Sequence, residues 1–197
     1  MNEILIKLVG TVPIMLHNNQ TVNPLNRYAH AMKTLTGKRK KTEADYLDIA
    51  RVEWEAGLYI HDGIIAIPGR CVDATFKNGA KRLKEGKRWL QGAMVMESYC
   101  PLEYKGKKIK FTENGIIPNP GLDEFFKLYS TVDIMKVGQN SIVRTRPIFQ
   151  DWSLECTVAY DENIFDMNTI KDILTSAGRY IGLCEGRPRN GKFEISF

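Results

Sequence analysis

The sequence lacks the patterns of the common catalytic and metal-binding sites. Its four cysteines form no C-x-x-C pair, and their spacing suits neither a zinc site nor a disulfide framework. Neither a G-x-x-x-x-G-K-[ST] phosphate loop nor a G-x-S-x-G nucleophile elbow occurs. The three histidines fall in no H-E-x-x-H or H-x-E spacing. We therefore expect no bound metal, no cofactor and no catalytic set.

Long apolar runs are also absent. No stretch approaches the ~20 apolar residues that a helix needs to span a bilayer. The first residues lack the basic segment and the apolar core of a signal peptide. We expect no membrane partner and a location in the reducing cytoplasm.

The composition is that of a folded, basic protein. Of the 197 residues, 43% are hydrophobic and 10% are aromatic, which is enough for a packed core. The net charge is +5 and the isoelectric point is about 9.0. A basic balance favours acidic partners such as nucleic acid or nucleotides, and solubility alone is the simpler explanation.

Local patterns predict the elements of the first half. Residues 3–16 predict a strand that Pro13 ends or redirects, since proline cannot donate to a strand ladder. Residues 17–42 are polar and basic, and we expect a mobile excursion there from a single domain over 1–197. Thr42 predicts the start of a helix that Gly57 ends. Asp62-Gly63 predicts a tight hairpin turn.

The second half alternates strand-like and helical segments. We expect a helix at about 70–85, broken strands over 91–117, a break at 118–121, a short helix or loop at 122–129, and strand-like runs at 132–137 and 141–143. A strand at 152–160, a helix at about 168–181 and a closing strand at 192–197 follow. Interleaved strands and helices without alternating parallel units predict an α+β sandwich.

Basic side chains gather on the helix predicted near residue 70. Lys77, Lys81, Lys84 and Arg88 follow one another at spacings that place them on one helical face. Only one acid, Glu85, lies among the six cations of this segment. A solvated face normally mixes both signs, so we interpret this one as a polyanion-binding face, with plain solvation as the alternative.

A loop rich in glycine and arginine separates the last predicted helix from the last strand. It contains Gly186, Arg187, Arg189 and Gly191, and Lys192 lies beside it. Glycine lets backbone amides approach a ligand, and arginine offers forked donors that match phosphate. We interpret the loop as the place where the protein meets an anion. A helix cap and a simple turn are the alternatives.

Further residues fit an anionic ligand. Arg144 and Arg146 precede the C-terminal strand, and lysine-rich runs occupy 38–41 and 105–110. Aromatic residues lie near some of these cations, as single-strand binding requires: Trp89, Tyr104, Phe111 and Phe149. His17 follows the first strand. It either contacts a base or phosphate or has a surface or capping role.

The order of several segments resembles a family of small phage and prophage proteins. These segments are LVGTVPIMLH at 8–17, AIPGR at 66–70, RTRP at 144–147, WSLECTVAY at 152–160, AGRYIG at 177–182 and GRPRNGKFE at 186–194. The layout of the two ends is also similar to the RAMP superfamily, the RRM-like backbone subunits of CRISPR surveillance complexes. The resemblance implies a ferredoxin-like (RRM-like) antiparallel sheet with helices on one face. It also implies that the open sheet face and the glycine-rich loop hold a single strand, with subunits lined up along it.

Three functions follow from these observations. We expect a non-enzymatic phage protein that binds single-stranded RNA or DNA as a homo-oligomer in the host cytoplasm. Its phosphate contacts would come from the arginine loop, Lys192 and the basic helix. A counter-defence protein that sequesters a small or cyclic nucleotide signal is the second hypothesis. An RNA-processing nuclease is the third, with His17 as the histidine placed near a binding face.

Overall fold

The computed structural model describes residues 1–110, 130–137 and 140–197. The chain divides into two compact units. Unit 1 comprises Met1–Met15, Ile60–Ile109 and Phe149–Phe197, and unit 2 comprises Leu16–Tyr59 and Lys110–Ile148. The fold is α+β with antiparallel strand pairs, which confirms the predicted class.

The main sheet of unit 1 joins both ends of the chain. Strand β1 (Asn2–Gly10) lies between β11 (Trp152–Tyr160) and β12 (Phe193–Ser196), and it is antiparallel to both. On its other side β11 pairs with β5 (Ala93–Val95) and with β7 (Glu103–Tyr104), which continues into β8 (Lys107–Lys108). The expected strands at both ends are confirmed, and Pro13 separates β1 from the short β2 (Ile14–Met15).

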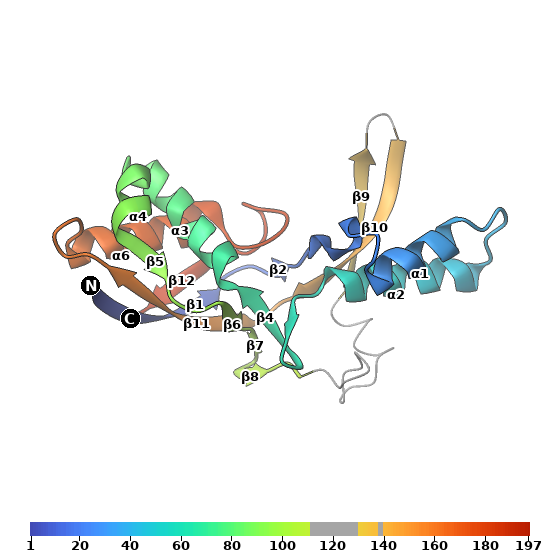
Figure 1. The fold of residues 1–197 in the computed structure, drawn as a ribbon, viewed down its shortest axis with the longest axis horizontal. Coiled ribbons are helices and arrows are strands. Elements are labelled where there is room, and N and C mark those ends of the chain that lie inside the picture. Colours follow the sequence, from blue (N-terminus) through green and yellow to red (C-terminus); the bar gives the residue numbers. More distant parts are fainter. Residues whose placement is uncertain (111–129, 138–139) are drawn as a thin grey trace. The chain divides into compact units, whose positions relative to one another are not determined.

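Helices cover one face of this sheet. They are α3 (Gly69–Arg82), α4 (Gly86–Gly92), α6 (Met167–Ser176) and the short π-helix η2 (Ala177–Ile181), and Figure 1 shows α3, α4 and α6 on the same side. The strands alternate, so Ile6 and Leu8 of β1 point into the core beneath the helices. Phe76 of α3 makes edge contacts there with Trp89 and Phe193. Burying each of these rings contributes roughly 1.5–3 kcal/mol.

A second, smaller sheet of unit 1 begins with the predicted hairpin. Strands β3 (Ile60–His61) and β4 (Ile64–Pro68) are antiparallel, and β4 also pairs with β6 (Tyr99–Pro101). Asp62 and Gly63 have φ angles of 49° and 71°. Two successive positive φ angles are what a tight hairpin turn of this type requires.

Unit 2 combines two helices with a hairpin. Helix α1 (Arg27–Thr36) packs on α2 (Glu43–Gly57), and the turn η1 (Asn19–Val22) contacts both. Strands β9 (Ser130–Val137) and β10 (Asn140–Phe149) are antiparallel, and β10 ends in unit 1 at Phe149. Helix α2 starts with a complete capping box, in which Thr42 and Asp45 satisfy each other's backbone amides. The predicted helix start and stop are confirmed.

Several expectations differ from the structure. The range 17–42, expected as a mobile excursion, contains η1 and α1 and belongs to unit 2 together with α2. The basic helix ends at Arg82 instead of 85, and Gln91 and Gly92 finish α4 instead of starting a strand. The segments predicted at 118–121 and 122–129, and Phe111, lie outside the described residues.

Candidate anion-binding sites

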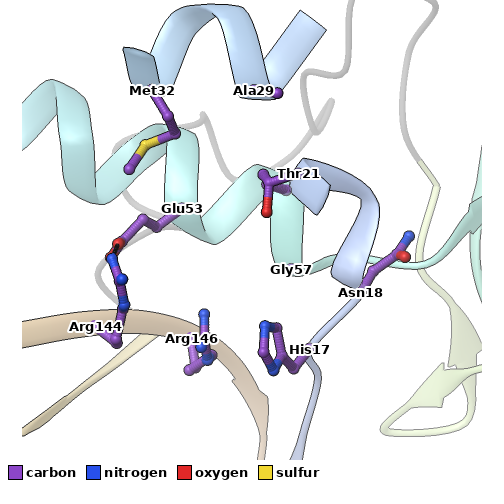
Figure 2. Close-up of a pocket in the computed structure, with 10 residues that line it drawn as sticks. His17, Asn18, Thr21, Ala29, Met32, Glu53, Gly57, Arg144 and Arg146 are labelled. Carbon is purple, nitrogen blue, oxygen red and sulfur yellow. Dashed lines mark hydrogen bonds and ion pairs between the residues drawn. The ribbon is translucent and has the colours of Figure 1, made fainter. Parts of the chain in front are cut away.

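Three residues from distant parts of the sequence meet in unit 2. His17, Arg144 and Arg146 line a cavity of about 330 Å³ that Figure 2 shows in close-up. The other lining residues come from η1 and its approach, from α1 and from α2: Asn18, Thr21, Ala29, Met32, Glu53, Ala56 and Gly57. The fold of unit 2 therefore brings together three of the residues that the sequence predicted.

Glu53 ties strand β10 to helix α2 at this cavity. Its Oε1 accepts a hydrogen bond from Nη1 of Arg144, and its Oε2 accepts one from the Thr145 amide at 2.9 Å. The Glu53 side chain is 8% exposed, whereas that of Arg144 is 35% exposed. Both carboxylate oxygens are thus engaged, and the Arg144 guanidinium is held in a fixed orientation.

The chain around His17 is anchored through its backbone. The Leu16 amide donates to the Pro147 carbonyl at 2.9 Å, and the Asn18 amide donates to the Gly57 carbonyl at 3.0 Å. The hydroxyl of Tyr59 donates to the His17 carbonyl at 2.9 Å. These bonds hold the peptide in place, and the imidazole lines the cavity close to the level of Arg146 in Figure 2.

The cavity has one cationic wall and one apolar wall, and Glu53, Asn18 and Thr21 add further polar groups to its lining. Arg144, Arg146 and His17 supply N–H donors, and the Arg146 residue is only 8% exposed. Ala29 and Met32 of α1 line the side that faces them in Figure 2. Such a lining suits a ligand that carries an anionic group at one end and an apolar ring at the other.

Backbone hydrogen bonds hold the glycine-rich loop of unit 1 in place. The Leu183 amide donates to the Gly191 carbonyl, and the Gly191 amide donates to Pro13, each at 2.8 Å. Gly186 and Gly191 both have a φ of 71°, and a Cβ at Gly191 would lie 1.9 Å from the Leu183 carbonyl oxygen. The interpretation that these glycines free amides for a ligand is wrong for Gly191, because its amide is already bonded.

Arg187 and Lys192 lie in different surroundings. Arg187 and Arg189 are exposed. Burial raises the pKa of the Cys71 thiol, and the positive charges of Arg70 and Arg187 lie close enough to oppose that rise. Arg187 and Arg70 therefore both lie near the first turn of α3. Lys192 instead lines a separate hollow of about 440 Å³ together with Arg179.

The basic face of α3 is shorter than predicted. Lys84 has a φ of 64°, and the Glu85 amide donates to the Ala80 carbonyl, so the helix has already ended. Lys84 therefore does not continue the row of Lys77 and Lys81. Arg88 lies on α4, where it pairs with Glu85 at 2.8 Å and stacks over Phe165.

Arg70 is a further cation on the face of α3 that carries Lys77 and Lys81. Arg70, Lys77 and Lys81 are spaced by seven and four residues, which puts them on one helical face. Their row lies opposite the buried positions Val72 and Phe76. Within the described part of the chain, neither Arg70, Lys77 nor Lys81 forms an ion pair.

The sheet face opposite the helices differs from a stacking surface. Leu5, Val9 and Met94 are exposed there, and Lys7 is paired with Glu103 at 3.1 Å and Glu155 at 3.4 Å. The described positions of β1, β5, β11 and β12 on this face include no aromatic ring. Nothing on these strands offers the base stacking that the family resemblance implies for the open face.

Sequence reasoning missed several residues at these sites. Arg70 had a signal, because it precedes Lys77 by two helical turns. Glu53, Asn18 and Thr21 had none, since only the folding of α2 and η1 against β10 places them beside His17. Among the described residues, no group of three or more His, Cys, Asp or Glu side chains is placed to hold a metal ion.

No protein-family model matches the chain, and no curated protein is significantly similar to it in sequence. In the part of the chain that the structure describes, no helix has the length and apolar character needed to cross a membrane.

Proposed function

We propose that the protein binds single-stranded nucleic acid, without cleaving it, through a cationic surface of unit 1. The surface consists of the α3 row Arg70, Lys77 and Lys81 with Arg187 and Arg189 of the loop. The observation that carries the proposal is the absence, within the described residues, of any ion pair at these five cations. Unpaired guanidinium and ammonium groups on one surface attract phosphates and release counterions on binding.

The cationic surface rests on rigid elements. The Thr75 hydroxyl of α3 donates to the Cys71 carbonyl at 3.0 Å and lies 3.3 Å from the Gly182 carbonyl oxygen, so the start of the loop lies against the helix. A Cβ at Gly79 would lie 2.7 Å from Cβ of Ala177, so α3 and η2 are in close contact. The lysine row and the arginine loop therefore keep their relative positions, which lowers the ordering cost of binding a strand.

We further propose a ferredoxin-like core for unit 1 and membership of the phage family with RAMP-like layout. In support, the antiparallel strands follow the order β12-β1-β11-β5, with α3 between β1 and β5 and α6 between β11 and β12. On this view unit 2 is built from two insertions into that core. The single-stranded nucleic acid lies on the surface formed by the loop and α3 instead of on the open sheet face. Several copies of the protein bind along one nucleic acid strand.

Salt-dependent anisotropy tests the proposal. A labelled 20-nucleotide RNA or DNA should bind at low salt, with log K falling by about 0.7 per phosphate contact for each decade of salt. Replacing Arg187 and Arg189 together by alanine should reduce that slope by about 1.4. Lys7→Ala is the matched control, because it removes a cation from the opposite sheet face. Undetectable binding at low salt, or an unchanged slope in the double variant, would refute the proposal.

The same samples test the nuclease alternative. His17 lies in the cavity of unit 2 with two arginines, which is a set of groups that general acid–base cleavage of RNA uses. We expect the labelled RNA and DNA to remain intact over hours of incubation. Cleavage that His17→Ala abolishes would replace the binding proposal by an enzymatic one.

A further inference from the structure

We infer that unit 2 contains a second binding site, separate from the cationic surface of unit 1, that takes one nucleoside monophosphate group. The group belongs either to a free nucleotide or to one nucleotide of a strand, since the chemistry recognised is the same. The inference rests on the cavity in Figure 2 and does not depend on strand binding by unit 1.

The size of the cavity fits one nucleotide. Its volume of about 330 Å³ is close to the lower limit of small-molecule pockets, which span roughly 300–1,000 Å³. A mononucleotide with its base folded toward the phosphate fills such a space, whereas a dinucleotide exceeds it. The cavity therefore holds one nucleotide at a time, whether that nucleotide is free or part of a strand.

The cationic wall matches a phosphate. Arg144 and Arg146 are two positions apart on β10, so both side chains are on the same side of the strand. Glu53 engages Arg144 and the Thr145 amide with its two oxygens, so its carboxylate is turned to the protein. Guanidinium groups bind phosphate with parallel N–H···O hydrogen bonds, and Arg144, Arg146 and His17 all line this cavity.

The facing wall matches a base. Ala29, Met32 and Ala56 give it an apolar surface, beside which the Thr21 hydroxyl offers one hydrogen-bonding group. Methionine adapts its shape to flat rings and makes favourable contacts between its sulfur and an aromatic edge. Asn18 at the rim already donates to the Leu58 carbonyl at 3.0 Å, so its amide oxygen is turned away from that bond.

Calorimetry with the full chain tests this site. AMP, GMP, CMP and UMP are titrated singly, beside the four nucleosides, inorganic phosphate and a 20-nucleotide strand. We expect at least one monophosphate to saturate at one per chain. The nucleosides and inorganic phosphate should bind at least tenfold more weakly, because each occupies one wall only.

Two variants probe the two walls. His17→Ala removes a donor from the cationic wall, and Ala29→Leu fills the cavity from the apolar wall without changing any charge. Each should weaken the monophosphate at least tenfold while the melting temperature stays within about 2 °C of the parent. Lys7→Ala is the control, because Lys7 lies in unit 1 outside the proposed cationic surface and its loss should leave this affinity unchanged.

The outcomes separate this inference from the proposed function. If the monophosphates do not bind but Ala29→Leu weakens the 20-nucleotide strand tenfold, the site holds a nucleotide of a strand. A second outcome overturns this site and supports binding by unit 1 alone. In it, the affinity for the 20-nucleotide strand falls only in Arg187→Ala, and calorimetry detects no binding of the monophosphates at millimolar concentration. Monophosphate binding that Ala29→Leu leaves unchanged also overturns it.

Discussion

Replacing Gly191 by alanine should destabilise unit 1 far more than the same change at Gly106. Both glycines have nearly the same positive φ, 71° and 73°. At Gly106 a new Cβ would find no atom within 4 Å, so the cost is the left-handed conformation alone, about 1–2 kcal/mol. At Gly191 the Cβ would lie 1.9 Å from the Leu183 carbonyl oxygen and 2.7 Å from its nitrogen.

The extra cost at Gly191 follows from the bonds that must give way. Moving Leu183 aside breaks the hydrogen bond from its amide to the Gly191 carbonyl. It also strains the hydrogen bond from the Gly191 amide to the Pro13 carbonyl. Each such bond contributes about 0.5–1.5 kcal/mol. Gly191→Ala should therefore cost about 2–5 kcal/mol in total, which corresponds to a loss of roughly 5–15 °C in melting temperature.

Scanning calorimetry and amide hydrogen exchange measure this difference. We expect faster exchange of the Leu183 and Gly191 amides in Gly191→Ala, and no change there in Gly106→Ala. Equal losses of stability in the two variants would refute the reasoning, because they would mean that the contact with Leu183 has no effect. Weaker strand binding by Gly191→Ala would in addition tie the shape of the loop to its proposed role.

Three further outcomes follow from unit 2. Thr42→Ala removes the N-terminal cap of α2. The free energy of unfolding of the protein, measured in urea, should fall by about 1 kcal/mol. Hydrogen bonds from Lys38 and Thr42 hold the pKa of Asp45 at about 2, below its usual 3.8. The stability that Asp45 contributes is therefore present above pH 4 and lost as the pH falls toward 2, and acid titration of Asp45→Asn should show a smaller loss. Glu53→Gln deprives Arg144 of its carboxylate and should cost about 1.5–3 kcal/mol in the same urea assay, whereas an unchanged stability would contradict the role of Glu53 as a tie.

The elements with local signals are the ones that the sequence predicts well. The start of α2 at Thr42 and the turn at Asp62-Gly63 depend on residues within three positions of one another. Helix α1 was missed because its only fully buried side chain is Tyr28, so it shows little apolar periodicity. The end of α3 was missed because Lys84 adopts the left-handed conformation that glycine normally signals.

The candidate sites divide in the same way. Composition drew attention to the arginines of the loop and to His17, Arg144 and Arg146 as single residues. No local pattern indicates that the last three line one cavity with Glu53, because that arrangement depends on α2 packing against β10. Sequence reasoning finds the charges, and tertiary structure decides which of them act together.

The division of unit 1 into three chain segments has a consequence for synthesis in the cell. The chain changes unit at residues 15–16, 59–60, 109–110 and 148–149, so neither unit is a continuous stretch. Strand β1 pairs with β11 and β12, and Asn2 faces Tyr160 in the register. At the usual 5–20 residues per second, the ribosome needs roughly 10–30 s to deliver those partners. During that interval the segment that becomes β1 has no pairing partner and exposes Ile4, Ile6 and Leu8, so we expect a nascent-chain chaperone to bind there.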